Sequence, residues 1–295
     1  MIQTRSYEFM VKYTPQREWI EKRGIFMWLA MFSIELGAGA FVVSSIVGNT
    51  LGMLIGWLLC ALLGGGFHLY YLGKPFRFWR MVFSSGWQSS WISRGLIFVS
   101  LFLGLGLIHI ALAQWASSPT ALMIVADIFA VLTVIYVGFV MASVNGIALW
   151  NTPLLPVLYL ILGIWGGLGI TLVVLNIAGG TGNPSLVEEW SRIFLIAFAF
   201  IVLVYLLTIR YQGSAGKASV QTIVAGKIAP FFWAGVVLLG TVVPAGVALA
   251  TWLGDWSIPT AFLIVLIVFE LLGDLALRYS ILKAGLYAPL LPSIK

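Results

Sequence analysis

Eight long apolar runs constrain the fold of this chain more than any other feature of its sequence. Each has about the 20 residues that a helix needs to cross roughly 30 Å of hydrocarbon. Backbone amides in lipid must be hydrogen-bonded internally, and uninterrupted apolar runs of this length indicate helices rather than barrel strands. The runs fall at about 24–47, 50–72, 94–115, 120–148, 153–177, 190–210, 227–252 and 259–283.

The chain is 61% hydrophobic and only 9% charged, which excludes a soluble globular protein, where about a quarter of residues are charged. We therefore predict an all-α integral membrane protein with eight transmembrane helices. Residues 1–23 form an amino-terminal segment, 24–283 the transmembrane domain and 284–295 a short tail. The first 23 residues carry mixed charge and no short apolar core, so we expect the first span to act as the insertion signal.

Lys and Arg gather in the amino terminus, the 73–94 connection, the 210–227 connection and the carboxy-terminal end. The other side carries Glu188, Glu189 and Asp255, with Arg192 as the main exception. The positive-inside rule then predicts a multi-pass protein of the cytoplasmic membrane with both termini in the cytoplasm.

The counts of cysteine and histidine limit the cofactors. Cys60 is the single cysteine, so no intrachain disulfide can form and the four thiolates of an iron–sulfur cluster are lacking. The two histidines, His68 and His109, lie at opposite ends of their spans, which argues against bis-histidine haem. We expect no metal, haem or cluster in this protein, and nothing in its sequence indicates nucleic acid as a partner.

Small residues in the first and fifth spans indicate close helix packing. They are Gly37-Ala38-Gly39-Ala40, and then Gly163, Gly166, Gly167 and Gly169. Close approach of the backbone to a flat ligand ring is the less favoured alternative.

Ionisable residues inside spans are costly and therefore informative. Glu35, Asp127, Glu270 and Asp274 form a possible proton relay. Asp274 and Arg278 are four residues apart, so they can pair on one helical face. Glu270, one turn earlier, has no obvious partner in its own helix. It can meet another helix, stay protonated or relay protons.

A basic, aromatic stretch joins the second and third apolar runs. His68 ends the second run, and Lys74, Arg77, Arg80 and Arg94 follow among Phe and Trp residues. Cations and aromatics of this kind commonly anchor a protein at the headgroup level. An imidazole there also suits proton transfer to a redox ligand. The pattern alone leaves both interpretations open.

This stretch resembles the signature of the polysulfide reductase membrane subunit family (NrfD/PsrC type). The similarity rests on His68-Leu-Tyr-Tyr-Leu-Gly-Lys-Pro-Phe-Arg-Phe-Trp-Arg80 and on Ser89-Ser-Trp-Ile-Ser-Arg-Gly95. Weaker similarities are Leu36–Phe41, Thr152–Pro156, Leu277–Tyr279 and Lys283–Gly285. The resemblance implies a haem-free anchor of eight helices in two four-helix bundles. Such anchors pass electrons between the quinone pool and a four-cluster ferredoxin-like iron–sulfur subunit, which serves a catalytic subunit, frequently of molybdopterin type.

The resemblance also implies roles for individual residues. Some members of the family carry a polar residue or histidine early in the first span, where this protein has none between Gly24 and Trp28, and Glu35 is our substitute. We expect His68 and Glu35 to act in catalysis. The expected site for menaquinone or another quinone comprises His68, Tyr71, Arg77, Arg94 and Glu35. The expected docking surface for the iron–sulfur subunit comprises Lys74, Arg77, Arg80 and Arg94.

Three alternatives remain. The protein can be a proton-translocating module of a redox complex without its own quinone site. A transporter is disfavoured because the two halves show no matching pair of helix breaks. The quinone site can also lie on the acidic face, where the candidates are His109, Gln114, Asp127 and Asn176.

Overall fold

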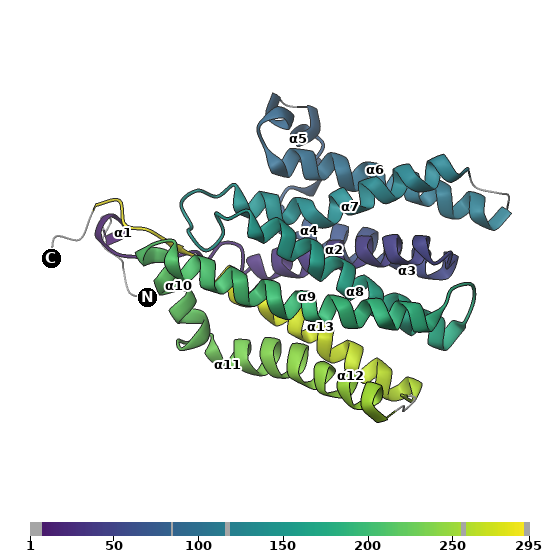
Figure 1. Ribbon diagram of the computed structural model, residues 1–295. Helices are drawn as coiled ribbons and strands as arrows, with labels where there is room; N and C mark the ends of the chain where they lie inside the picture. Colours follow the sequence, from purple (N-terminus) through teal and green to yellow (C-terminus); the bar gives the residue numbers. More distant parts are fainter. Residues whose placement is uncertain (1–7, 84, 116–118, 255–257, 292–295) are drawn as a thin grey trace.

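The computed structural model describes residues 8–83, 85–115, 119–254 and 258–291 (Figure 1). Within these ranges eight helical spans are long and apolar enough to cross a membrane, as the sequence predicts. Five are single helices: α2 (Gly24–Ile46), α6 (Trp91–Trp115), α7 (Thr120–Ala142), α8 (Leu154–Ala178) and α9 (Pro184–Tyr211). A sixth single helix, α13 (Thr260–Lys283), ends the bundle.

The two remaining spans contain π-helical segments that the apolar pattern does not reveal. The second span consists of α3 (Thr50–Leu58), the π-helix η1 (Leu59–Gly64) and α4 (Gly65–Tyr71). The seventh consists of α11 (Ala229–Phe231), the π-helix η4 (Phe232–Val242) and α12 (Val243–Gly254). η1 packs against α2 and η4 packs against α13. π-segments within helices are frequent at functional sites, and these two flank the helices that carry the buried charges described below.

Short elements connect the spans. Their bounds are α1 (Glu8–Val11), β1 (Thr14–Pro15), η2 (Pro75–Arg77), α5 (Arg80–Phe83), η3 (Ser85–Gln88), α10 (Ser214–Val224) and β2 (Leu286–Tyr287). We call the face where α2 begins and α13 ends the terminal face. The opposite face, with the turn at 47–49 and the loop at 179–183, is the distal face.

The terminal segments lie together, as an even number of spans requires (Figure 1). β1 pairs antiparallel with β2, and the Gln16 amide donates to the Gly285 carbonyl at 2.8 Å. The Trp19 ring packs on Trp150, whose indole N–H donates to the Ile281 carbonyl at 2.9 Å. The two terminal segments therefore close over the bundle at the terminal face.

The helices form two groups that meet along α2 and α8. α2 packs on α3, η1, α4 and α7, and α6 packs on α7; in the second group α8 packs on α9 and α13, and α13 on η4. At the α2–α8 contact a side chain on Gly39 would overlap the Gly163 carbonyl. The small residues of the first and fifth spans thus serve close helix packing.

Two predicted span boundaries are wrong, and one predicted connection contains a helix. The fourth span ends at Ala142 rather than 148, because the Asn151 amide donates to the Ala142 carbonyl at 2.7 Å and holds residues 143–153 as a loop. The sixth begins at Pro184 rather than 190, since Asn183 caps the amide of Ser185 at 3.0 Å. The 210–227 connection contains the helix α10.

Candidate functional site

An apolar cavity of about 330 Å³ lies among α2, α4, α6 and α7 in the half of the bundle nearest the terminal face. Met27, Met31 and Ile34 of α2 form one wall, and Tyr136 of α7 lines another. His68 of α4 is the ionisable side chain among the lining residues with a pKa near neutrality in ordinary peptides. Small-molecule pockets typically have volumes of about 300–1,000 Å³ and mostly apolar walls with few polar groups. The cavity has these properties.

His68 lies in the last turn of the second span. Its carbonyl accepts from the Leu72 amide at 3.1 Å, and the helix ends before Gly73, whose φ of +67° suits glycine. The side-chain Nδ1 atom is buried and has no hydrogen-bond partner among the described residues. A buried ring nitrogen without a partner is costly, and here it belongs to a residue that lines the cavity.

The other residues expected at the quinone site lie elsewhere. Tyr71 is partly buried at the end of α4 and Arg77 is exposed in η2; neither is among the residues lining the cavity. Glu35 is fully buried and also does not line the cavity, although its neighbour Ile34 does. The structure therefore brings together His68 and apolar groups, and separates them from the expected polar partners.

The expected docking cations divide into two kinds. Lys74, Arg77 and Arg80 are exposed, beside Phe76, which is 91% exposed. Arg94 instead donates from Nε to the Trp87 carbonyl at 3.3 Å and from Nη2 to the Gln88 carbonyl, with its guanidinium 4.7 Å from the Trp91 ring centre. Its contacts hold η3 against the start of α6.

A buried ion cluster joins the two helix groups. Arg278 of α13 donates from Nε and Nη2 to the Asp274 carboxylate, at 2.6 and 3.2 Å, which confirms the predicted pair. Its Nη1 also donates to Glu35 Oε2 of α2 at 2.5 Å. All three side chains are at most 3% exposed. We call Glu35, Asp274 and Arg278 the ion cluster.

The ion cluster has one formal positive charge and two formal negative charges, so one bound proton makes it neutral. Glu35 Oε1 is buried without a hydrogen-bond partner among the described residues, and it is an atom where such a proton can be held. The Tyr159 ring lies 4.7 Å from the Arg278 guanidinium and partly replaces the water that the cation loses on burial.

Sequence reasoning missed the Glu35–Arg278 contact and the role of Tyr159. The two charged residues are 243 positions apart, so no local spacing relates them. The sequence did carry one signal, the excess of acidic over basic residues inside the spans. One cation among several carboxyl groups requires pairing between helices.

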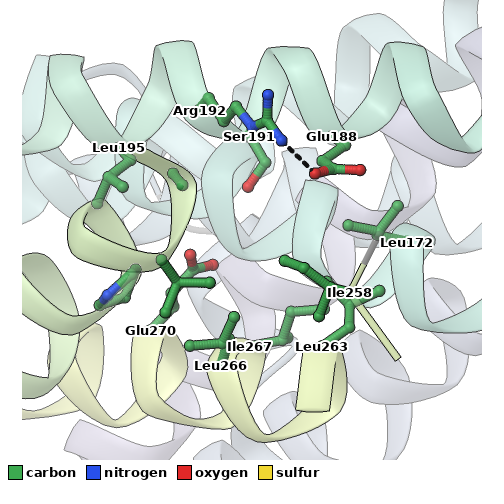
Figure 2. Close-up of a pocket in the computed structure, with 13 residues that line it drawn as sticks. Leu172, Glu188, Ser191, Arg192, Leu195, Ile258, Leu263, Leu266, Ile267 and Glu270 are labelled. Carbon is green, nitrogen blue, oxygen red and sulfur yellow. Dashed lines mark hydrogen bonds and ion pairs between the residues drawn. The ribbon is translucent and has the colours of Figure 1, made fainter. Parts of the chain in front are cut away.

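The other proposed relay residues lie toward the distal face. Glu270 lies one turn before Asp274 on α13 and lines a small hollow beside α9 (Figure 2). Asp127 Oδ2 accepts from Ser45 of α2 at 2.9 Å, and its Oδ1 is buried without a partner among the described residues. Glu270 thus lies one turn from the ion cluster on α13, whereas Asp127 contacts α2 near its distal end.

The residues of the alternative site on the acidic face are also separated. His109 is buried with its ring 6.5 Å from that of Phe41. Gln114 is exposed near the end of α6, and Asn176 of α8 lines a polar hollow beside α9 and α12. Across the described ranges no group of three or more His, Cys, Asp or Glu is arranged to hold a metal ion.

Known proteins are similar to this one in sequence. Protein NrfD homolog of Haemophilus influenzae is 21% identical over 92% of this protein and 96% of its own length. Protein NrfD of Escherichia coli is 27% identical over 74% of this protein and 76% of its own length. The C chain of polysulfide reductase from Wolinella succinogenes is 28% identical over 57% of this protein and 55% of its own length.

The family described as polysulphide reductase, NrfD matches residues 22–289, which include every span and the stretch from His68 to Gly95. The resemblance inferred from that stretch is confirmed. The chain is a multi-pass membrane protein that belongs to the polysulphide reductase NrfD family.

Proposed function

We propose that this protein is the quinone-reactive membrane anchor of a respiratory oxidoreductase in the cytoplasmic membrane. It would pass electrons between the quinone pool and a docked four-cluster ferredoxin-like iron–sulfur subunit, which serves a catalytic subunit of molybdopterin type. The observation that supports the proposal is the 330 Å³ apolar cavity lined by His68, a residue whose buried Nδ1 atom has no partner among the described residues.

The residues present fit a quinone. Met27, Met31 and Ile34 offer an apolar wall to a ring and its hydrocarbon tail, and His68 offers one hydrogen-bonding atom. A bound quinone would supply two-electron, two-proton redox chemistry. His68 would orient the ligand through Nδ1 and hold or release one proton there, because an imidazole exchanges protons near neutral pH. The apolar walls would exclude bulk water from this atom.

Exposed charges at the same face support docking of a partner there. Lys74, Arg77 and Arg80 extend from the segment that follows His68, so a partner bound to them would lie beside the cavity. Cations on such a surface would attract an acidic partner face and set orientation and association rate more than affinity. The name of the Wolinella relative denotes one polypeptide of a reductase with several, and it supports a subunit role.

The test is quinol-driven reduction of the iron–sulfur clusters in the purified complex, followed optically, for wild type and His68→Ala. His109→Ala is the matched control, because it removes the other histidine of the protein from a position in the distal half of α6. We expect loss of about 10²–10⁴-fold in rate for His68→Ala, the usual contribution of general acid–base catalysis, and little change for His109→Ala. A rate of cluster reduction in His68→Ala as high as in His109→Ala, with the complex intact, would refute the proposed site.

The ion cluster favours a second candidate function, a proton relay formed by Glu35, Asp274 and Glu270. Ionisable groups at this depth are usually functional, and Glu35 Oε1 and Glu270 both lack partners among the described residues. Asp127, which contacts Ser45, would join the relay from α7. Under this candidate Glu270→Gln abolishes proton translocation in proteoliposomes and spares quinol oxidation. Loss of both activities together would assign the carboxyls to the quinone chemistry instead.

A further inference from the structure

Two adjoining hollows enter the second helix group from the distal face. The outer one has a volume of about 340 Å³ and is lined by Asn176, Ser185 and Thr251 among others. The inner one, of about 50 Å³, is lined by Ser191, Ala248 and Glu270 among others. α9 and α13 begin at the distal face and α12 ends near it, so the inner residues lie about two turns deeper on α9 and α13 and about one turn deeper on α12.

Glu270 lies at the inner end of this path. Its side chain is partly exposed although its helix is packed in the bundle. Figure 2 shows its carboxyl group facing the space between α13 and α9. Within the part of the protein that the structure describes, no hydrogen bond or ion pair to Glu270 is found. A carboxyl group at this depth requires a polar partner, and water in the hollow is the partner that the geometry allows.

The hollow has room for water. A buried water needs a cavity of at least about 10–15 Å³ and two to four polar partners, and the inner hollow has about 50 Å³. Glu270 and Ser191 both line it, together with Glu188 and Arg192 (Figure 2).

An ion pair lies where the two hollows meet. Arg192 Nη2 contacts Glu188 Oε1 at 2.5 Å on α9 and donates to Thr251 Oγ1 of α12 at 3.3 Å. Glu188 and Arg192 line both hollows, so they lie between the distal face and Glu270. Both side chains are about one-third exposed, at 38% and 34%, and can change rotamer without disturbing the bundle.

We propose that the two hollows form an aqueous port that leads water and its protons from the distal face to Glu270, with the Glu188–Arg192 pair as its neck. Asp274 follows one helical turn further along α13 and accepts a hydrogen bond from Arg278. The port therefore ends one helical turn from the ion cluster. The use of the port rests on the relay candidate above. The existence of the port rests on the two hollows and can be tested separately from the relay.

The test is the accessibility of introduced cysteines to a membrane-impermeant methanethiosulfonate carrying a quaternary ammonium group. Cys60 is the single native cysteine and is fully buried, so the background is low. Ser191→Cys and Ala248→Cys place a thiol in the inner hollow. Phe200→Cys is the matched control, because Phe200 is also on α9 but is 65% exposed on the outside of the bundle.

The intact complex is reconstituted in vesicles and the reagent is added from each side separately. We expect both inner cysteines to react from the distal side only, and Phe200→Cys, which faces lipid, to remain unmodified. Adding Arg192→Gln removes a partly exposed ion pair and should speed the reaction about twofold to fivefold. No reaction of either inner cysteine above the Phe200→Cys level, or reaction from the terminal side alone, would overturn the port.

This readout is independent of electron transfer. A negative labelling result would reject the port and would not affect the proposal of quinol-driven cluster reduction at the His68 cavity. Labelled inner cysteines in a complex whose Glu270→Gln variant still translocates protons would retain the port and reject the relay. The two proposals therefore fail by different measurements.

Discussion

Removing the positive charge of the ion cluster should destabilise this protein far more than removing one of its two negative charges. Arg278 makes three N–H···O contacts, two with Asp274 and one with Glu35, and all three side chains are at most 3% exposed. Arg278→Met leaves two carboxyl groups buried without their cation. The loss of one partner from a buried pair typically costs about 3–5 kcal/mol.

Glu35→Gln should cost much less. The Asp274–Arg278 pair keeps both of its contacts, and the amide oxygen of the new side chain is still able to accept from Nη1 across 2.5 Å. The change replaces one charge-assisted hydrogen bond by a neutral one, a difference of about 1 kcal/mol. It also leaves the cluster with one formal charge of each sign.

The measurement is SDS-induced unfolding of the protein in mixed micelles, followed by the fluorescence of its 13 tryptophans. A triple variant with Arg278→Met, Asp274→Leu and Glu35→Leu serves as the control. It removes every charge together, so it should recover most of the stability that Arg278→Met loses. An Arg278→Met variant as stable as Glu35→Gln, or a triple variant no more stable than Arg278→Met, would refute the argument that unpaired buried charge causes the loss.

Two further predictions concern packing and pH. Gly39→Val should abolish stable assembly, because any side chain there overlaps the Gly163 carbonyl of α8 and overpacking costs about 1–3 kcal/mol or more; size-exclusion chromatography in detergent tests it, and a monodisperse variant contradicts it. The pKa of Glu21, outside the spans, is lowered by its hydrogen bond from Lys283 at 2.5 Å. This pair therefore adds stability at pH above about 4.5 and loses it as the pH falls below that value, by at most about 1 kcal/mol for so exposed a pair. Thermal unfolding of wild type against Glu21→Gln should converge at low pH, and a constant difference contradicts the pairing.

Hydropathy was sufficient to predict the fold because the bilayer restricts a spanning polypeptide of this kind to apolar helices of about 20 residues or more. It could not predict where α7 ends, since that depends on a side-chain bond from Asn151 to the Ala142 carbonyl. It also gave no sign of η1 and η4, because a π-helix and an α-helix have the same apolar composition. Hydropathy reports how favourably a segment partitions into lipid, and an α-helix and a π-helix of the same residues partition equally well.

The site was predicted only as far as its residues lie on one helix. Asp274 and Arg278 are four positions apart, and their spacing alone predicts the pair. The contact of Arg278 with Glu35 depends on how α2 meets α13, and four separate helices contribute to the cavity at His68. Contacts of this kind arise from tertiary packing, which local periodicity does not encode.

The position of Glu35 determines which variants can separate the two candidate functions. Glu35 belongs to the ion cluster through Arg278, while its neighbour Ile34 lines the His68 cavity. A change at Glu35 can therefore disturb both quinol oxidation and proton movement, and its loss of activity would not distinguish them. His68 lines the cavity and does not belong to the ion cluster, and Glu270 lines the inner hollow and does not line the cavity. If cavity and relay work separately, His68→Ala stops cluster reduction with passive proton conduction intact, and Glu270→Gln does the reverse. Identical losses in both variants would mean that electron transfer and proton movement are one coupled process, carried through the ion cluster between them.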